Sequence, residues 1–174
     1  MAGRNSMDKL IAQSLRRFRR YVHDTHWSGR ENEAVNLYAL GFLLGGDLDG
    51  VKLEPTQIGI EVAVAVALKK GKKAQVRKDL VIWPEAGMNR WHPGNSPRNK
   101  PLAILEWKVQ RPNAAKPRGT EYDLDWLKRY STKRPDFIGY CVFLDLRSVP
   151  ATISVKRVAM RKSKPFPIEK LNDK

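Results

Sequence analysis

Glu106 and Lys108 are the residues of this chain whose types and spacing most directly suggest chemistry. They interrupt the apolar run PLAILEWKVQ at 101–110, which predicts a buried strand. Side chains alternate along a strand, so Glu106 and Lys108 share one face while Trp107 points to the other. Burying two charges is costly unless good geometry or a metal compensates. The two residues are therefore either a structural ion pair at a strand end or part of a site.

A third charged residue, Asp79, lies in a second apolar strand predicted at 74–83. An isolated Asp is unfavourable inside a strand and needs a partner. The two strands are neighbours in the chain, so all three charged groups can meet on one side of a strand pair. Two carboxylates repel each other unless a divalent cation lies between them, and oxygen ligands suit Mg²⁺ or Mn²⁺. A lysine beside such a cation can orient or deprotonate a water, or neutralise charge on a phosphate.

Two glutamates, Glu31 and Glu33, begin a nearly all-apolar helix predicted over 29–44. Carboxylates favour a helix N-terminus because of the helix dipole, which is a sufficient structural explanation. Each glutamate also heads an apolar stripe on the helical wheel, so at least one must lean toward the core. The functional interpretation makes Glu31 or Glu33 a further carboxylate of the site.

The remaining elements predict an α/β sandwich with a mixed central sheet of four to five strands. An amphipathic basic helix capped by Ser6 comes first, and a second amphipathic helix is expected at 121–132. Further strands are predicted at 58–68, 137–146 and 151–160, with a long loop at 84–100. We expect three parts: a basic helix with its connection at 1–28, a core domain at 29–160, and a basic flexible tail at 161–174.

The charge of the chain indicates a polyanionic partner. Among 174 residues, 33 Lys and Arg outnumber 18 Asp and Glu, which gives a net charge of +15. No apolar stretch reaches membrane-spanning length and no signal peptide is apparent, so we expect a cytoplasmic protein with no membrane partner. The single cysteine, Cys141, cannot form an internal disulfide and lies in an apolar run, so we interpret it as a core residue in a reducing compartment.

Several basic residues are candidates for nucleic-acid contact, although each also has a plain structural interpretation. The basic face of the first helix suits phosphate contact and a solvated docking helix equally well, and the turn KKGKK suits phosphate contact or a solvated hairpin tip. The candidates are Arg16, Arg17, Arg19 and Arg20 of the first helix, Lys72 and Lys73 of the turn, and Lys128 of the helix at 121–132.

Taken together, Asp79, Glu106-Trp107-Lys108 and the glutamate-headed helix resemble the PD-(D/E)xK nuclease superfamily. The resemblance implies a restriction-endonuclease-like three-layer sandwich with an extra N-terminal basic helix, and a Mg²⁺-dependent endonuclease. It implies that Asp79, Glu106 and the carbonyl of Trp107 bind the metal and that Lys108 serves the attacking water. A glutamate of the core helix, Glu31 or Glu33, completes the site.

The chain departs from the family pattern in two places. Lys78 stands where the motif has proline, before Asp79, and 26 residues separate Asp79 from Glu106, which makes 84–100 an insertion. By the resemblance alone, DNA is favoured over RNA as the substrate, and a homodimer would suit the cutting of two strands. The alternative is a non-catalytic protein on the same fold that binds nucleic acid or forms part of a complex.

Overall fold

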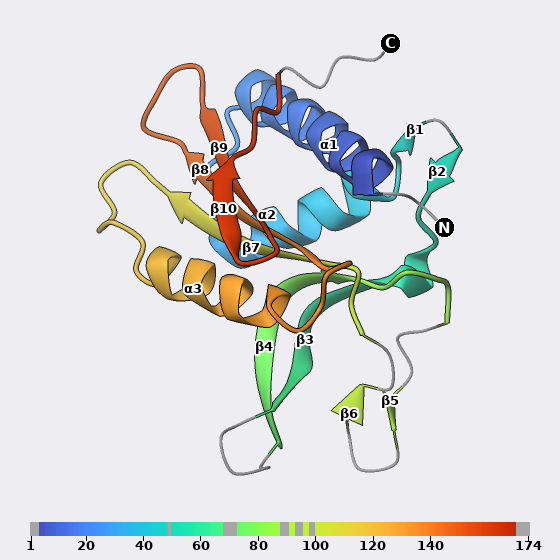
Figure 1. Cartoon of the computed structure of the whole chain (residues 1–174). Coiled ribbons are helices and arrows are strands. Elements are labelled where there is room, and N and C mark those ends of the chain that lie inside the picture. Colours follow the sequence, from blue (N-terminus) through green and yellow to red (C-terminus); the bar gives the residue numbers. More distant parts are fainter. Residues whose placement is uncertain are drawn as a thin grey trace.

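A six-stranded mixed sheet forms the centre of the structure (Figure 1). The computed structural model describes residues 4–48, 50–67, 73–87, 91–92, 96–97 and 100–169. In spatial order, the strands are β10 (Lys162–Pro165), β9 (Thr152–Ala159), β8 (Ile138–Asp145), β7 (Ala103–Gln110), β4 (Lys73–Ile82) and β3 (Ile58–Ala67). Only β7 and β8 run parallel, and all other neighbours in this sheet are antiparallel.

Helices cover both faces of this sheet (Figure 1). One face is covered by α1 (Arg4–Thr25) and by α2 (Glu31–Leu37), which continues as a π-helix over Tyr38–Leu43. The other face is covered by α3 (Thr120–Ser131), the crossover between β7 and β8. The short elements are β1 (Asp47–Leu48), β2 (Val51–Lys52), a 3₁₀ turn (Pro55–Gln57), β5 (Trp91–His92) and β6 (Ser96–Pro97).

Alternation along β7 separates the two layers of the core. Leu105 and Trp107 face α1 and α2, whereas Ile104 packs in the cluster under α3. Trp107 is fully buried, and its ring centroid lies 5.5 Å from that of Phe18 and 5.0 Å from that of Tyr38. Side chains alternate along a strand, so Glu106 and Lys108 point to the same face as Ile104, which is the face covered by α3.

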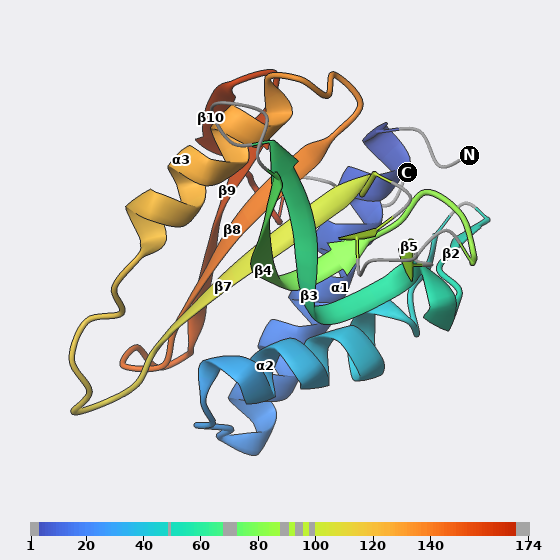
Figure 2. The same cartoon turned by 90° about the horizontal axis from the view of Figure 1, so that it is seen from below.

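The β3–β4 hairpin projects away from the rest of the sheet (Figure 1). β4 pairs with β7 only where residues 80–82 oppose 103–105, and beyond this stretch the two strands diverge (Figure 2). Within the hairpin, pairing lapses at Glu61 and the opposing Asp79, and Glu61 has a φ of +53°. At this bend the hairpin changes the face that it presents: Leu80 packs with α1 and α2, whereas Lys78 lies against Trp126 of α3.

The α/β class and the mixed sheet are confirmed, but the main sheet is larger than expected. Residues 162–165, which the sequence assigned to a flexible tail, form β10, and Phe166 and Ile168 after it are buried. The turn between β9 and β10 has positive φ at Met160 and Arg161, of 49° and 67°. Hairpin turns of this kind usually carry Gly or Asn, and Met160 and Arg161 are neither, so this hairpin had no signal in the sequence.

The N-terminal helix belongs to the core. Its fully buried residues in the cluster that contains Trp107 are Leu10, Ile11, Leu15 and Phe18.

None of the helices in the described ranges combines the length and the apolar run that crossing a membrane requires.

Candidate active site

The three charged strand residues meet where β4 leaves β7. The carboxylate of Asp79 accepts a hydrogen bond from the backbone N–H of Trp107, with Oδ2 at 2.7 Å. Asp79 thus supplies the acceptor that the backbone of β4 would supply if the two strands remained paired. Trp107 is the residue between Glu106 and Lys108, so the contact joins all three residues of the predicted motif.

Glu106 does not pair with Lys108. Its Oε1 lies against Nζ of Lys78, and both side chains are nearly inaccessible, with 5% and 2% exposed. Nζ of Lys78 also lies 4.0 Å from the ring centroid of Trp126, a cation–π contact. Burial raises the pKa of Glu106 to about 8, and Asp79 adds to the rise while Lys78 opposes it. The carboxylate therefore occupies an environment in which added positive charge is favourable.

Lys108 is surrounded by oxygen atoms. Its Nζ donates to Oε1 of Glu31 at 3.1 Å and to the carbonyl of Trp107 at 2.8 Å, and lies 3.2 Å from Oδ2 of Asp123. Burial alone would lower the pKa of Lys108, but the nearby carboxylates outweigh it and raise the pKa above its ordinary value. Lys108 is therefore a fixed ammonium group. It is suited to orienting a water or neutralising charge, and not to removing a proton.

The two glutamates of α2 have different positions. Glu31 reaches Lys108, and burial raises its pKa despite the neighbouring lysine. Glu33 turns back instead and accepts the backbone N–H of Arg30 at 2.8 Å, as part of a capping box. Of the two alternatives, the structure therefore brings Glu31 to Lys108, whereas the carboxylate of Glu33 caps the helix.

Two residues of the site were not predicted as members. Asp123 lies in the first turn of α3, and its carboxylate contacts Lys108 on the sheet face that α3 covers. Its signal in the sequence was an acidic residue at the start of an amphipathic helix, which the helix dipole explains equally well. Lys78 had a clearer signal, since a lysine among the apolar residues of β4 needs a partner just as Asp79 does.

The arginines predicted to contact nucleic acid lie on α1, which covers the other face of the sheet. On α1, Arg16 donates to the carbonyl of Ile168 at 2.6 Å, Arg17 donates to that of Gly45 at 3.1 Å, and Arg19 pairs with Glu169. These arginines thus bind the chain itself, on the face opposite α3. The others are placed as follows: Arg20 is exposed beside Tyr21 and Asp24, Lys128 pairs with Asp125 at 3.6 Å, Lys73 begins β4, and Lys72 lies outside the described residues.

The middle of β7 carries oxygen donors of the kind that a hard divalent cation binds. Asp79 and Glu106 supply carboxylate oxygens and Trp107 supplies a carbonyl, and the charge of Asp79 contributes to the raised pKa of Glu106. Within the described ranges no three His, Cys, Asp or Glu side chains form a group that could hold a metal. Mg²⁺ needs no such group, because it usually keeps several waters and binds one or two carboxylates together with substrate phosphates.

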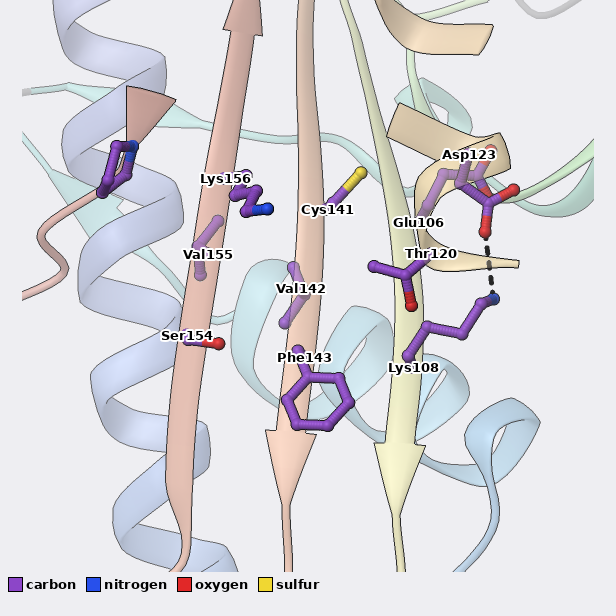
Figure 3. Close-up of a pocket in the computed structure, with 11 residues that line it drawn as sticks. Glu106, Lys108, Thr120, Asp123, Cys141, Val142, Phe143, Ser154, Val155 and Lys156 are labelled. Carbon is purple, nitrogen blue, oxygen red and sulfur yellow. Dashed lines mark ion pairs between the residues drawn. The ribbon is translucent and has the colours of Figure 1, made fainter. Parts of the chain in front are cut away.

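A cavity of about 260 Å³ opens beside these residues on the α3 face of the sheet (Figure 3). Glu106, Lys108 and Asp123 line one side, and Cys141, Phe143 and Lys156 of the next two strands line the other. Burial raises the pKa of Cys141 to about 12, so its thiol is neutral and serves as a small wall residue. The cavity gives a small ligand access to the charged group.

Comparison with known proteins adds no relationship. No family model, no curated protein and no solved structure matches the chain. A function must therefore be argued from the geometry of this site.

Proposed function

We propose that this chain is a divalent-metal-dependent nuclease of the PD-(D/E)xK type, acting on DNA phosphodiester bonds. The observation that carries the proposal is the hydrogen bond from the N–H of Trp107 to Asp79, which joins Asp79 to the Glu106-Trp107-Lys108 segment. β4 bends where it makes this contact, and β-ladder pairing lapses there, at Glu61 and Asp79. Glu61, at this bend, also has a positive φ, which strains a residue other than glycine. Backbone strain of this kind is often found at functional sites.

The order of elements supports the same proposal. A helix that carries Glu31 is followed by the antiparallel strands β3, β4 and β7, then by the crossover helix α3 and the parallel strand β8. This is the order expected for a restriction-endonuclease-like core, with α1 as an added N-terminal helix and β9 and β10 extending the sheet. The net charge of +15 supports a nucleic-acid partner.

Each residue has a definite role in the proposed reaction. Asp79, Glu106 and the carbonyl of Trp107 would hold Mg²⁺ or Mn²⁺, which when bound supplies a Lewis acid for the phosphate oxygens. Lys108, as a fixed cation, orients the attacking water and neutralises charge that develops on the phosphate. Glu31 and Asp123 keep Lys108 in place through their contacts with its Nζ.

A second candidate function is a non-catalytic subunit that binds nucleic acid or a larger complex. The observation that favours it is the internal neutralisation of the site: Glu106 already has Lys78 as a partner, and Asp123 already has Lys108. Such a protein would bind DNA with a steep salt dependence and would not cut it.

Cleavage assays separate these two functions. The purified protein is incubated with linear, supercoiled, single-stranded and branched DNA in Mg²⁺, Mn²⁺ or EDTA. We expect cleavage of at least one substrate in Mg²⁺ or Mn²⁺ and none in EDTA. The nuclease proposal fails if all four substrates remain intact with both metals, or if cleavage in EDTA equals that in Mg²⁺.

The different positions of the two α2 glutamates provide a matched pair of variants. Glu31→Gln removes one of the charges that fix Lys108 and should lower the cleavage rate about 10- to 100-fold, as outer residues of metal sites commonly do. Glu33→Gln keeps the capping box, which accepts glutamine, and should cleave at the parent rate. Rates are measured in Mg²⁺ at matched protein concentrations. Equal rates for the two variants would contradict the assignment of Glu31.

A further inference from the structure

We propose that the cavity beside Glu106 and Lys108 binds one unpaired nucleotide next to the scissile phosphate, so that the substrate is single-stranded at this point. The inference rests on the proposed nuclease function for the chemistry of Glu106 and Lys108. It adds the form of nucleic acid that the site accepts.

Strand register places the cavity directly beside the site. Glu106 of β7 aligns with Cys141 of β8, which aligns with Lys156 of β9. Lys108 of β7 likewise aligns with Phe143, and Phe143 aligns with Ser154. Neighbouring strands are about 4.8 Å apart, so Lys156 begins about 10 Å from Glu106 on the same face. These two rows of side chains form a continuous floor that runs from Glu106 and Lys108 to Lys156 (Figure 3).

The far part of this floor is not covered by α3. Leu127 of α3 packs closely against Gly139 near the start of β8, where a Cβ would lie only 3.0–3.1 Å from the leucine side chain. Further along β8 and β9, Phe143 is only half-buried, while Ser154 and Lys156 are exposed. Phe143 belongs to neither apolar cluster of the described residues. The sheet therefore presents an aromatic ring to the cavity where an ordinary core strand would bury it.

The chemistry of these groups suits a nucleotide. An aromatic side chain can stack on any base, and a lysine binds phosphate without regard to sequence. Lys156 has no ion-pair partner within the described ranges, whereas Lys108 has two and Lys78 has one. Phe143 and Lys156 are thus available to a base and to a phosphate next to the one at Lys108.

The size of the cavity selects the unpaired form. At about 260 Å³ it has room for one base and not for a base pair with its two backbones. A duplex cannot enter, because its major groove alone is about 12 Å wide. One base that has left its stack can enter, and a single strand offers such bases without the cost of unpairing them.

Binding measurements in EDTA test this proposal without cleavage. Fluorescence anisotropy compares a labelled single-stranded oligonucleotide with the duplex of the same sequence. We expect Phe143→Ala to weaken single-strand binding about tenfold, the size of one lost base stack, and duplex binding less than about twofold. Phe143→Trp should retain single-strand binding. Lys156→Ala should weaken single-strand binding and reduce its salt slope by about one phosphate contact.

Matched controls come from exposed residues outside the cavity. Tyr122→Ala removes an exposed ring from α3, and Lys52→Ala removes an exposed lysine from β2. Both should bind both oligonucleotides within about twofold of the parent. Thermal unfolding of Phe143→Ala checks its fold. If Phe143→Ala does not fold, single-strand binding by Phe143→Trp, which keeps an aromatic ring, tests the proposal instead. A loss of single-strand binding in Phe143→Trp equal to that in Phe143→Ala would then overturn the proposal.

The outcomes distinguish this inference from the proposed function. The nucleotide site is overturned if Phe143→Ala binds single strands as tightly as the parent does, or if it binds the single strand and the duplex more weakly by the same factor. This holds even if the parent cuts DNA. Binding of single strands that depends on Phe143, in a protein that cuts nothing in Mg²⁺ or Mn²⁺, supports the nucleotide site and overturns the nuclease.

Discussion

Lys108→Ala is expected to lower the rate of DNA cleavage in Mg²⁺ about 100- to 1,000-fold, while the protein still binds DNA in EDTA. The magnitude is that of removing one preorganised donor that stabilises charge in the transition state. The structure provides this preorganisation, because three oxygen atoms, from Glu31, Asp123 and Trp107, hold Nζ of Lys108 within 3.2 Å. Cleavage is followed on labelled DNA and binding by anisotropy.

Two controls define the meaning of this result. Lys133→Ala removes an exposed lysine just after α3 and should cut at the parent rate. Lys108→Arg keeps the charge but changes the donor geometry, and should retain less activity than the parent. Equal cutting by Lys108→Ala and the parent would refute the mechanism. A large loss of stability in Lys108→Ala, with no cleavage by the parent, would instead identify Lys108 as a structural partner of Asp123 and Glu31.

The sequence was sufficient to place the charged residues on their elements. Apolar runs marked the strands of Asp79 and Glu106, and alternation placed Glu106 and Lys108 on one face and Trp107 on the other. The apolar helix with glutamates at its start was also predictable, but it is not buried all round, because Leu40 is 66% exposed. These features depend on local periodicity, which a single sequence carries. Whether the residues form a metal site stays a prediction.

The pairing of the charges was not predictable, because it depends on the bend of the β3–β4 hairpin. Regular alternation would place Lys78 on the same face as Leu80, which packs against α1 and α2. The bend at Glu61 and Asp79 reverses the faces, so Lys78 reaches Glu106 and Trp126 on the α3 side. Positive φ at a glutamate has no signature in the sequence.

The partners of long charged side chains could not be predicted from the sequence either. The arginines of α1 looked like a free basic face, but Arg16 and Arg19 bind Ile168 and Glu169, about 150 residues later in the chain. The choice between Glu31 and Glu33 was decided by a helix cap, in which Glu33 turns back to Arg30. Such contacts follow from the tertiary arrangement.

Lys78→Met is expected to lower the free energy of unfolding by about 3–5 kcal/mol, the usual effect of removing one partner of a buried ion pair. Lys78 and Glu106 are 2% and 4% exposed, so Glu106 would be left in the protein interior without a cation. Urea unfolding measures the change. Arg77→Met, one position earlier and exposed, should alter stability by no more than about 0.5 kcal/mol.

The double variant Lys78→Met/Glu106→Gln should recover most of the loss, because it removes both charges together. Comparing the two variants with and without Mg²⁺ also tests whether Glu106 binds metal, with no need for a cleavage assay. A ligand that binds only the folded state stabilises it, and stabilises it more the tighter it binds. In Lys78→Met the carboxyl of Glu106 has lost its lysine partner, so a proton or a bound Mg²⁺ must neutralise it. Mg²⁺ should therefore raise the unfolding midpoint of Lys78→Met more than that of the double variant. Equal shifts in the two would mean that Glu106 is a structural partner of Lys78 and not a metal ligand.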